Sequence, residues 1–398
     1  MPNTGSQASG GLLDTLTLAR LKEVGPIRAG RLLAEFGGPD AVFGASVSRL
    51  CRVEGIGSKT AEGIARGVPR ARKASEREIE RAAELGARIV TYADDDYPPL
   101  LRDLPDRPIV LSVLGALEPS GRDRFAVGIV GSRRCSVYGQ EQANRFGAAL
   151  ASAGLTLVSG GARGIDSAAH RGAVSASGRT AVVLGCGLSH VYPPENRALF
   201  DQIVESNGCI ISELPIDAPP DRLNFPARNR IISGMSLGVL VIEAALKSGA
   251  LITARVAAED HGREVFALPG RVDSESIAGS LSLLKSGGAH LVTEPADVLS
   301  LLESPARHLA AGTHAPRYNP EPLRHQAQEA QDSGLSQPRA RHAEGTPERL
   351  LLDCLSEPRT ADAISDITGL DASQTRRAVT MLELSGEVRR SGSKIARS

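Results

Sequence analysis

The chain has 398 residues, its 46 lysines and arginines balance 46 aspartates and glutamates, and 41% of its residues are hydrophobic. This length predicts two or three domains, and the neutral total means that a nucleic-acid site has to come from local clustering of charge. The first residues lack the basic start and apolar run of a signal peptide, and there is no long uncharged apolar segment, so we expect a cytoplasmic protein without a membrane partner. The five cysteines form no CxxC pair and have no histidine at metal spacing, which argues against a metal site and against structural disulfides.

Residues 1–83 have the pattern of a helical domain, similar to a SAM or helix-hairpin-helix domain, in which a glycine-containing turn followed by a helix-like run occurs twice. In the second copy, Gly55 and Gly57 allow a tight turn whose backbone amides can meet a phosphate, and Lys59 adds charge. A helical packing domain whose glycines only make connections explains the same pattern. Gly55, Gly57 and Lys59 are therefore candidates for an accessory DNA contact, with the structural interpretation open beside it.

Short β-branched runs alternate with helical patterns through residues 84–302, most regularly over 125–296. The predicted strands cover residues 126–130, 155–158, 180–184, 209–211, 239–242 and 264–267, and the predicted helices cover 136–153, 165–177, 196–205 and 249–260. Apolar strands joined by helices predict an α/β fold, an extended Rossmann-like, doubly wound parallel sheet covered on both faces. Residues 108–115 are strand-like and would extend one edge of this sheet.

Residues 303–346 are rich in proline and histidine and contain no valine, isoleucine or phenylalanine, which predicts a flexible linker. Residues 347–398 fit a winged-helix domain of three helices and a hairpin. The helix predicted at residues 373–384 exposes Arg376 and Arg377, which are accessory DNA-binding candidates. Because acidic and basic residues balance in this module, docking to a protein is a second interpretation.

Glycine follows three successive strands of the predicted sheet, and arginine accompanies it after the first two, at the positions where ligands of doubly wound folds bind. The loops are Gly131-Ser132-Arg133, residues 159–166 with Arg163, and Gly185-Cys186-Gly187. Glycine admits close backbone approach, helix starts favour anions, and arginine offers a fork for phosphate oxygens. Three such loops indicate phosphate binding rather than tight turns alone, whereas the absence of GxGxxG and of a P-loop disfavours a dinucleotide or a nucleoside triphosphate.

Residues 222–234 add three arginines and one aromatic ring. Phe225 precedes Pro226, which stiffens the backbone, so its ring could present a face to a base, and Arg222, Arg228 and Arg230 could follow a phosphate backbone. In the structural alternative, Phe225 lies in the core and Arg230 pairs with Glu243.

An ordered series of motifs resembles the DprA (Smf) family of DNA-processing proteins of natural transformation. The series includes Val130-Gly131-Ser132-Arg133, Ser159-Gly160-Gly161-Ala162-Arg163-Gly164-Ile165-Asp166, Ser212-Glu213-Leu214-Pro215, Phe225-Pro226-Ala227-Arg228-Asn229-Arg230, Lys247-Ser248-Gly249 and Leu268-Pro269-Gly270. The resemblance implies a domain that binds and protects incoming single-stranded DNA and loads RecA recombinase onto it, without nucleotide hydrolysis and without a cofactor. It also implies a homodimer, with single-strand-binding protein as a further partner.

Carried onto this chain, the resemblance and the loop pattern together nominate a set of DNA-binding residues. They are Gly131, Ser132, Arg133, Ser159, Gly160, Gly161, Ala162, Arg163, Gly164, Asp166, Arg222, Phe225, Arg228, Asn229, Arg230, Lys247, Ser248 and Gly249. The chain departs from the family at Pro194, where a basic residue is common, and at Gly279, where the Gly-x-Asn pattern is absent. The first departure removes one expected phosphate contact.

Two other functions compete with this interpretation. The glycine-rich loop at 159–161 also resembles that of nucleoside-monophosphate phosphoribohydrolases, but the proline, threonine and glutamate of their loop are missing and Asp166 alone is left as a catalytic carboxylate. A nucleotide-sensing regulator would need a nucleobase pocket that the sequence does not reveal. We therefore expect a DNA-binding protein that is not an enzyme and has no catalytic residues.

Overall fold

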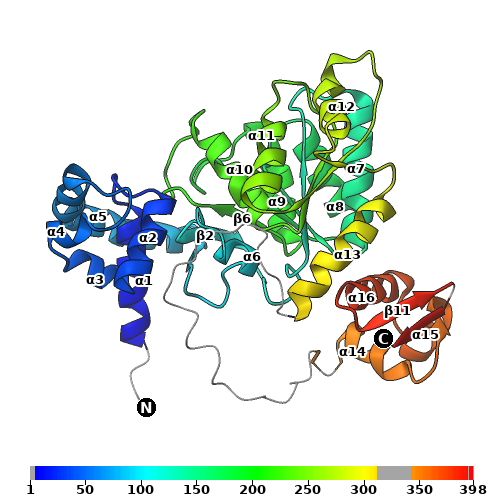
Figure 1. Cartoon of the computed structure of the whole chain (residues 1–398). Helices are drawn as coiled ribbons and strands as arrows, with labels where there is room; N and C mark the ends of the chain where they lie inside the picture. Colours follow the sequence, from blue (N-terminus) through cyan, green and yellow to red (C-terminus); the bar gives the residue numbers. More distant parts are fainter. Residues whose placement is uncertain (1–4, 312–341, 344, 393, 398) are drawn as a thin grey trace.

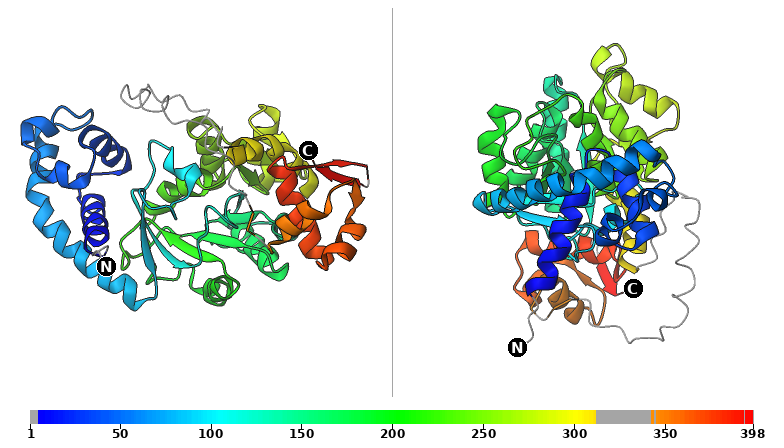
Figure 2. Two further views of the ribbon diagram at one scale, coloured as in Figure 1. Left: turned by 90° about the horizontal axis from the view of Figure 1, so that it is seen from below. Right: turned by 90° about the vertical axis from the view of Figure 1, so that its left-hand side faces the viewer.

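The computed structural model describes residues 5–311, 342–343, 345–392 and 394–397, which form a helical domain, a central α/β domain and a small C-terminal domain (Figure 1). The N-terminal helices and the C-terminal domain lie on opposite sides of the central sheet (Figure 2).

The N-terminal helices surround a core of their own, which includes Leu18, Leu32, Leu50 and Ile64. They are α1 (Gly5–Ala19), α2 (Pro26–Phe36), α3 (Pro39–Phe43), α4 (Val47–Leu50) and α5 (Ser58–Glu84). Arg20 at the end of α1 donates to both carboxylate oxygens of Glu78 at 2.7 Å and to the carbonyl oxygen of Glu213 at 3.2 Å. Arg20 therefore links the end of α1 to α5 within the helical domain, and it also links this domain to the central domain.

Nine strands of the described residues form one sheet in the order β1-β2-β6-β5-β4-β3-β7-β8-β9. They are β1 (Arg88–Thr91), β2 (Val110–Gly115), β3 (Ala126–Val130), β4 (Thr156–Ser159), β5 (Thr180–Val183), β6 (Cys209–Ser212), β7 (Gly238–Val241), β8 (Glu264–Ala267) and β9 (His290–Leu291). In this spatial order, all neighbouring strands from β6 through β5, β4, β3, β7 and β8 to β9 pair in parallel. Strand β2 is antiparallel to both of its neighbours, β1 and β6. All six predicted strands are confirmed within one residue at each end, and the strand-like segment 108–115 extends the sheet as predicted.

Helices cover both faces of this sheet. They are α6 (Pro99–Arg102), α7 (Val137–Ser152), α8 (Ile165–Ser175), α9 (Arg197–Glu205), α10 (Asn224–Gly234), α11 (Gly249–Arg255), α12 (Ala278–Lys285) and α13 (Pro295–Ala311), with a π-helical turn at Val256–Asp260. Ile129 of β3 packs in one core cluster with Phe146 of α7, whereas its neighbour Val130 packs in another with Ile231 of α10. Alternate residues of one strand thus enter different cores, which confirms the doubly wound α/β fold.

Helix α13 continues to Ala311, so the linker predicted from residue 303 begins later than the composition indicates. Leu302, Ala306 and Ala310 recur every four residues and are buried in the central core, which holds this last segment against the sheet. The rest of the predicted linker lies almost entirely outside the described residues.

The C-terminal domain has the predicted winged-helix elements. They are α14 (Pro347–Cys354), β10 (Arg359–Thr360), α15 (Ala361–Thr368), α16 (Ala372–Leu384), β11 (Val388–Ser391) and β12 (Lys394–Arg397). Asp371 and Gln374 form a reciprocal capping box that starts α16. Leu384 at the end of α16 belongs to the core of the central domain, which fixes the winged helix against α7 and α13. Among the described residues, no helix is long and apolar enough to cross a membrane.

Candidate nucleic-acid interface

Three glycine-containing loops meet at the carboxyl ends of β3, β4 and β5, and we call residues 131–134, 159–166 and 185–187 the carboxyl-end rim. The first two loops touch, because the Ile165 amide donates to the Ser132 carbonyl oxygen at 3.2 Å. Gly164 has φ +76°, and a Cβ there would lie 2.3 Å from the same Ser132 oxygen. Only glycine fits this approach, so Gly164 is required by a contact between two loops of the protein itself, and the predicted close approach of a ligand to these glycines stays a prediction.

An aromatic pair lies beside these loops. The guanidinium carbon of Arg133 lies 5.1 Å from the centroid of the Phe225 ring, and the Tyr192 ring lies 5.2 Å from the same centroid, tilted by 40°. A Cβ on Gly185 would lie 2.7 Å from Phe225 Cδ1, so the third loop of the rim also adjoins the ring. Arg133 is exposed and Phe225 is half-buried. Part of the ring is therefore exposed, and the Arg133 guanidinium lies over it.

Phe225 is placed by α10, a helix that the sequence analysis did not foresee. Pro226 lies in its first turn, where proline costs no hydrogen bond, and Ile231 and Ile232 bury the far side of the helix. Pro226 followed by Ile231 and Ile232 is a pattern that could predict this helix, but the closely spaced arginines obscure the helical period of the apolar residues.

The structure contradicts the prediction that Arg228 follows a phosphate backbone, because its side chain does not face solvent. Only 6% of it is exposed, and its guanidinium donates to the carbonyl oxygen of Gly160 at 2.7 Å and to that of Val183. Burial lowers the pKa of Arg228 to about 10, so the guanidinium stays charged at neutral pH. Arg228 holds the rim together instead of following a phosphate backbone.

Arg230 also turns inward. It pairs with both oxygens of Glu213 and approaches Asp106 at 3.9 Å, whereas the sequence alternative had named Glu243 as its partner. Asn229 is half-buried and accepts from Arg228 at 3.1 Å. Of the three predicted arginines of this segment, Arg222 alone is exposed.

Three polar side chains of the loop after β4 bond to other groups of the protein. Ser159 is buried and donates to the Ile129 carbonyl oxygen at 2.6 Å. Asp166 is buried and accepts from the Ala162 amide at 3.3 Å, and burial raises the pKa of its carboxyl group, against the opposing charge of Arg228. Arg163 is exposed and paired with Glu195. The predicted direct contacts of Ser159 and Asp166 are thus corrected, while the Arg163 head group stays accessible.

Gly160, Gly161 and Ala162 form the base of this loop. Gly161 has φ +62°, and the first two glycines are buried, whereas Ala162 is half-buried. Asn196 donates to the Gly161 carbonyl oxygen at 2.9 Å and so supports the loop from the segment that contains Pro194.

Glu243 occupies the position between β3 and β7 where the strand order reverses. Its carboxylate accepts from the Ser136 amide at 3.0 Å and from the Ser136 hydroxyl at 2.5 Å, and its carbonyl oxygen accepts from Ser132 at 2.7 Å. A Cβ on Gly139 would lie 2.3 Å from Glu243 Oε2. The start of α7, where a Rossmann enzyme holds the pyrophosphate of its dinucleotide, therefore already has an anion of the protein's own.

The loop after β7 carries Lys247, Ser248 and Gly249. Ser248 caps α11 by accepting from the Ala250 amide at 3.3 Å, Lys247 is exposed, and nothing lies within 4 Å of a Cβ placed on Gly249. This loop therefore presents an exposed lysine, for which the described part of the chain offers no ion-pair partner, and an open helix start at the carboxyl ends of the strands.

The accessory candidates also include both exposed side chains and one side chain that faces the protein. Gly55 has φ +82° and Gly57 caps α5, so the predicted tight turn before a helix is present, with Lys59 exposed on it. Arg376 is exposed on α16. Arg377 is half-buried, and a Cβ on Gly154 would lie 2.9 Å from its Cγ, so it faces the central domain rather than solvent.

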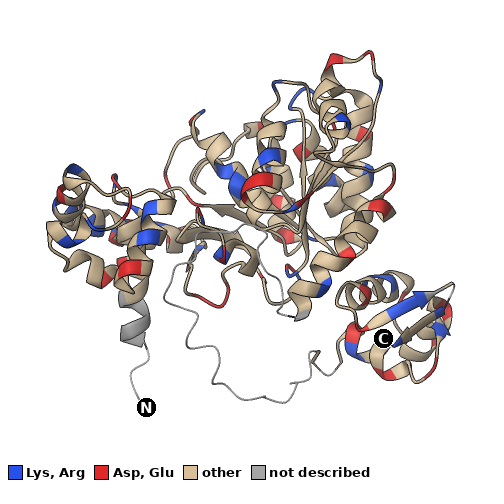
Figure 3. Ribbon diagram, in the orientation of Figure 1, with Lys and Arg blue, Asp and Glu red and all other residues tan. Residues whose placement is uncertain are grey.

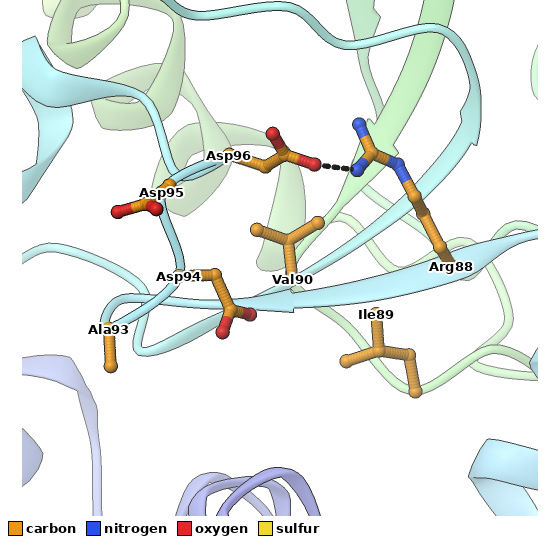
Figure 4. Close-up of a pocket in the computed structure, with 7 residues that line it drawn as sticks. All are labelled: Arg88, Ile89, Val90, Ala93, Asp94, Asp95 and Asp96. Atoms are coloured by element: carbon orange, nitrogen blue, oxygen red, sulfur yellow. Dashed lines mark hydrogen bonds and ion pairs between the residues drawn. The ribbon is translucent and has the colours of Figure 1, made fainter. Parts of the chain in front are cut away.

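A hollow of about 450 Å³ at the edge strand β1 is acidic, unlike the arginine-containing rim (Figure 4). Asp94, Asp95 and Asp96 line it beside Arg88, which pairs with Asp96. Three carboxylates against one paired cation repel phosphate, so this hollow is no part of a nucleic-acid interface. Among the described residues, no group of three potential ligands could hold a metal ion.

Three family models match this chain, and together they cover most of its described residues. Residues 88–303 match the family model described as DNA recombination-mediator protein A, residues 336–393 match the DprA winged helix domain, and residues 15–67 match a SAM-like helix-hairpin-helix tandem. The chain is 41% identical over 281 residues to Protein Smf of Synechocystis, covering 70% of each chain, and 43% identical over 233 residues to Protein Smf of Escherichia coli, covering 58% of this chain and 61% of that one.

Among solved structures, DNA processing protein A (DprA) from Streptococcus pneumoniae superposes with a TM-score of 0.61 at 31% identity. The match covers 75% of this chain and 98% of that one. Because the first family model alone spans more than half of its residues, the chain belongs to the DNA recombination-mediator protein A family of DNA-processing proteins.

Proposed function

We propose that this protein binds single-stranded DNA at the carboxyl-end rim and the adjoining Phe225 ring. The observation that carries the proposal is the placement of the exposed Arg133 guanidinium over the half-buried ring of Phe225, beside three loops whose glycines admit a backbone. A base stacked on an aromatic ring contributes about 1–3 kcal/mol and requires no particular sequence.

In this proposal, binding exchanges one contact of Arg133 for another. A base takes the face of the Phe225 ring, and the displaced guanidinium forms a charge-assisted hydrogen bond with a neighbouring phosphate. Arg163, Arg222 and Lys247 supply further exposed charge around the same edge. Arg228 and Asp166 contribute indirectly, since they hold the loop after β4 in shape.

Membership of a recombination-mediator family supports the wider role. We propose that the protein acts in the cytoplasm during natural transformation and DNA recombination, protects the incoming strand and loads RecA recombinase onto it. A homodimer and a contact with single-strand-binding protein belong to the same proposal. We also propose domain boundaries near residues 83 and 346, and we move the boundary expected at residue 302 to the end of α13 at Ala311.

The proposed function is not enzymatic. The one carboxylate that a phosphoribohydrolase mechanism would use, Asp166, is buried and accepts from a backbone amide, and Glu243 occupies the start of α7. Both observations favour a binding surface over a reaction centre.

The decisive experiment measures fluorescence anisotropy of a labelled single-stranded oligonucleotide titrated with the full chain at several salt concentrations. We expect binding that weakens linearly with the logarithm of salt concentration and varies little with base sequence. A folded protein that binds no single strand at low salt would refute the proposal, and nucleotide hydrolysis would then be assayed.

A further inference from the structure

A wide groove of about 1080 Å³ separates the winged helix from helices α7 and α13. The described residues that line it include five arginines from four elements, namely Arg145 of α7, Arg307 of α13, Arg376 of α16, and Arg389 and Arg390 of β11. All five are exposed. Figure 3 shows the basic residues of β11 beside those of α16 on the winged helix. Because the arginines come from both domains, the groove exists only when the domains are docked.

The groove keeps an excess of positive charge after its own acids are counted. Glu303 pairs with Arg307, and Glu383 accepts from Arg390 at 3.1 Å, so two carboxylates stand against five guanidinium groups. Arg145 bonds to the neutral amide oxygen of Gln142 at 3.2 Å. No carboxylate of the described chain lies within ion-pair distance of Arg376 or Arg389. These two side chains and Arg145 are therefore free to meet an anion without breaking an ion pair.

The walls of the groove are held in place by apolar packing. Leu384 belongs to the core of the central domain and Met381 packs against it. A Cβ placed on Gly386 would lie 3.5 Å from the side-chain carbons of Arg307, so the turn after α16 rests on α13. The arginines are thus presented by rigid elements at set positions, as recognition of a regular polyanion requires.

The lining also indicates which polyanion fits. None of the described residues that line the groove is aromatic, so this lining lacks the stacking platform with which proteins bind the bases of a single strand. Spaced arginines without aromatic rings suit the outward-facing phosphates of a duplex, which are contacted without reading the bases.

The groove lies far from the carboxyl-end rim. A neighbouring cavity of about 560 Å³ between the same two domains is lined by Phe125, Leu155 and Arg179, which directly precede β3, β4 and β5. The winged helix therefore sits at the amino ends of the strands whose carboxyl ends form the rim.

We propose that this arginine groove is a second nucleic-acid site, which binds the phosphate backbone of duplex DNA and is built jointly by the winged helix and the central domain. The protein would then hold a single strand at one end of its sheet and a duplex at the other. This proposal is independent of the function proposed for the rim, since it uses different residues and a different ligand.

The test compares binding of a short labelled duplex by the full chain and by two single variants, Arg145→Ala on the central domain and Arg389→Ala on the winged helix. Each variant should weaken duplex binding severalfold and make the slope of log affinity against log salt shallower by about 0.9, the value for one phosphate contact. Arg349→Ala is the matched control, because Arg349 lies on α14 of the same domain and pairs with Asp353 away from the groove.

Binding of a labelled single strand is measured in parallel and should be unchanged in Arg145→Ala and Arg389→Ala, which separates this site from the rim. The proposal is overturned if the wild type does not bind the duplex, or if neither variant differs from Arg349→Ala. It is also overturned if Arg389→Ala weakens binding while Arg145→Ala does not, because the winged helix would then act alone. Circular dichroism confirms that each variant is folded.

Discussion

The guanidinium of Arg228 in α10 donates to the carbonyl oxygen of Gly160 at 2.7 Å, and a Cβ on Gly160 would lie 2.3 Å from Nη2 of the same arginine. The arginine also bonds to the Val183 carbonyl, so it joins the ends of β4 and β5 from a third element. The shape of the loop after β4 therefore depends on a glycine and an arginine 68 residues apart.

Gly160→Ala should damage the rim, because the buried guanidinium cannot move away without losing both carbonyl partners. We expect a loss of about 1–3 kcal/mol in the free energy of unfolding, as for other overpacked sites, together with weaker single-strand binding. Urea unfolding and anisotropy measure the two effects. Gly11→Ala is the control, since Gly11 lies in α1 with open space around it and alanine favours a helix. Equal stability of the two variants would contradict the packing argument.

Phe225→Ala should weaken binding of a single strand by roughly 5- to 150-fold, which corresponds to the loss of about 1–3 kcal/mol for one stacked base. Leu223→Ala is its control, because Leu223 is 81% exposed nearby but offers no aromatic face. Similar losses in the two variants would show that general apolar contact, rather than stacking, explains the effect.

Arg133→Ala should change the salt dependence instead. Loss of one phosphate contact makes the slope of log affinity against log salt shallower by about 0.7 for a single strand. Arg122→Ala removes the same charge at the amino end of β3, where Arg122 pairs with Glu118, and should leave the slope unchanged. A slope that Arg133→Ala leaves at the wild-type value would exclude Arg133 from phosphate binding.

His170 should make the protein sensitive to acid. The Thr180 hydroxyl donates to the Leu157 carbonyl at 2.9 Å, so His170 Nδ1 must donate to Thr180 Oγ1, and the buried Nε2 has no partner among the described residues. Burial lowers the pKa of His170 from 6.5 to about 3. The unfolded chain therefore binds the extra proton first, and the stability present above pH 6.5 is lost as the pH falls toward 3.

The measurement is urea unfolding at pH 7 and pH 5 of the wild type and of His170→Leu, in which Thr180 keeps its carbonyl acceptor. Between these two pH values the wild type should lose about 2 kcal/mol more than the variant. Parallel losses would mean that other groups control the acid response.

Asp123→Ala should be among the most destabilising substitutions of a charged residue. Asp123 accepts from Arg179 at 2.6 Å and from Thr156 at 2.8 Å, and the Arg179 and Asp123 side chains are 9% and 4% exposed. Removing the carboxylate leaves a buried, uncompensated cation, which costs about 3–5 kcal/mol. Asp96→Ala breaks the exposed pair with Arg88 and should cost less than about 1 kcal/mol. Thermal unfolding of both variants checks the contrast.

The strands of the central sheet and the family could be predicted from the sequence, whereas helix α10 and the end of α13 could not. Strands such as Ala126–Val130 and Gly238–Val241 are predictable because a strand buried on both faces has to be continuously apolar. The glycine loops after β3 and β4 are predictable because only glycine allows the close approach that their geometry requires. The apolar run of a strand is visible within a few residues of sequence. The close contacts of Gly164 with Ser132 and of Gly160 with Arg228 instead join distant segments, so the sequence reveals these glycines but not their partners.

Which polar side chains are exposed at the rim and which are buried depends on the tertiary structure. Arg133 and Arg228 look alike in the sequence, yet one lies exposed over Phe225 and the other bonds two buried carbonyls. The arginine groove likewise combines Arg145 with Arg389, which are brought together only when α16 docks on α13. An arginine serves the surface or the core according to which unpaired carbonyls, carboxylates and rings the fold brings within its reach, and those partners come from distant parts of the chain.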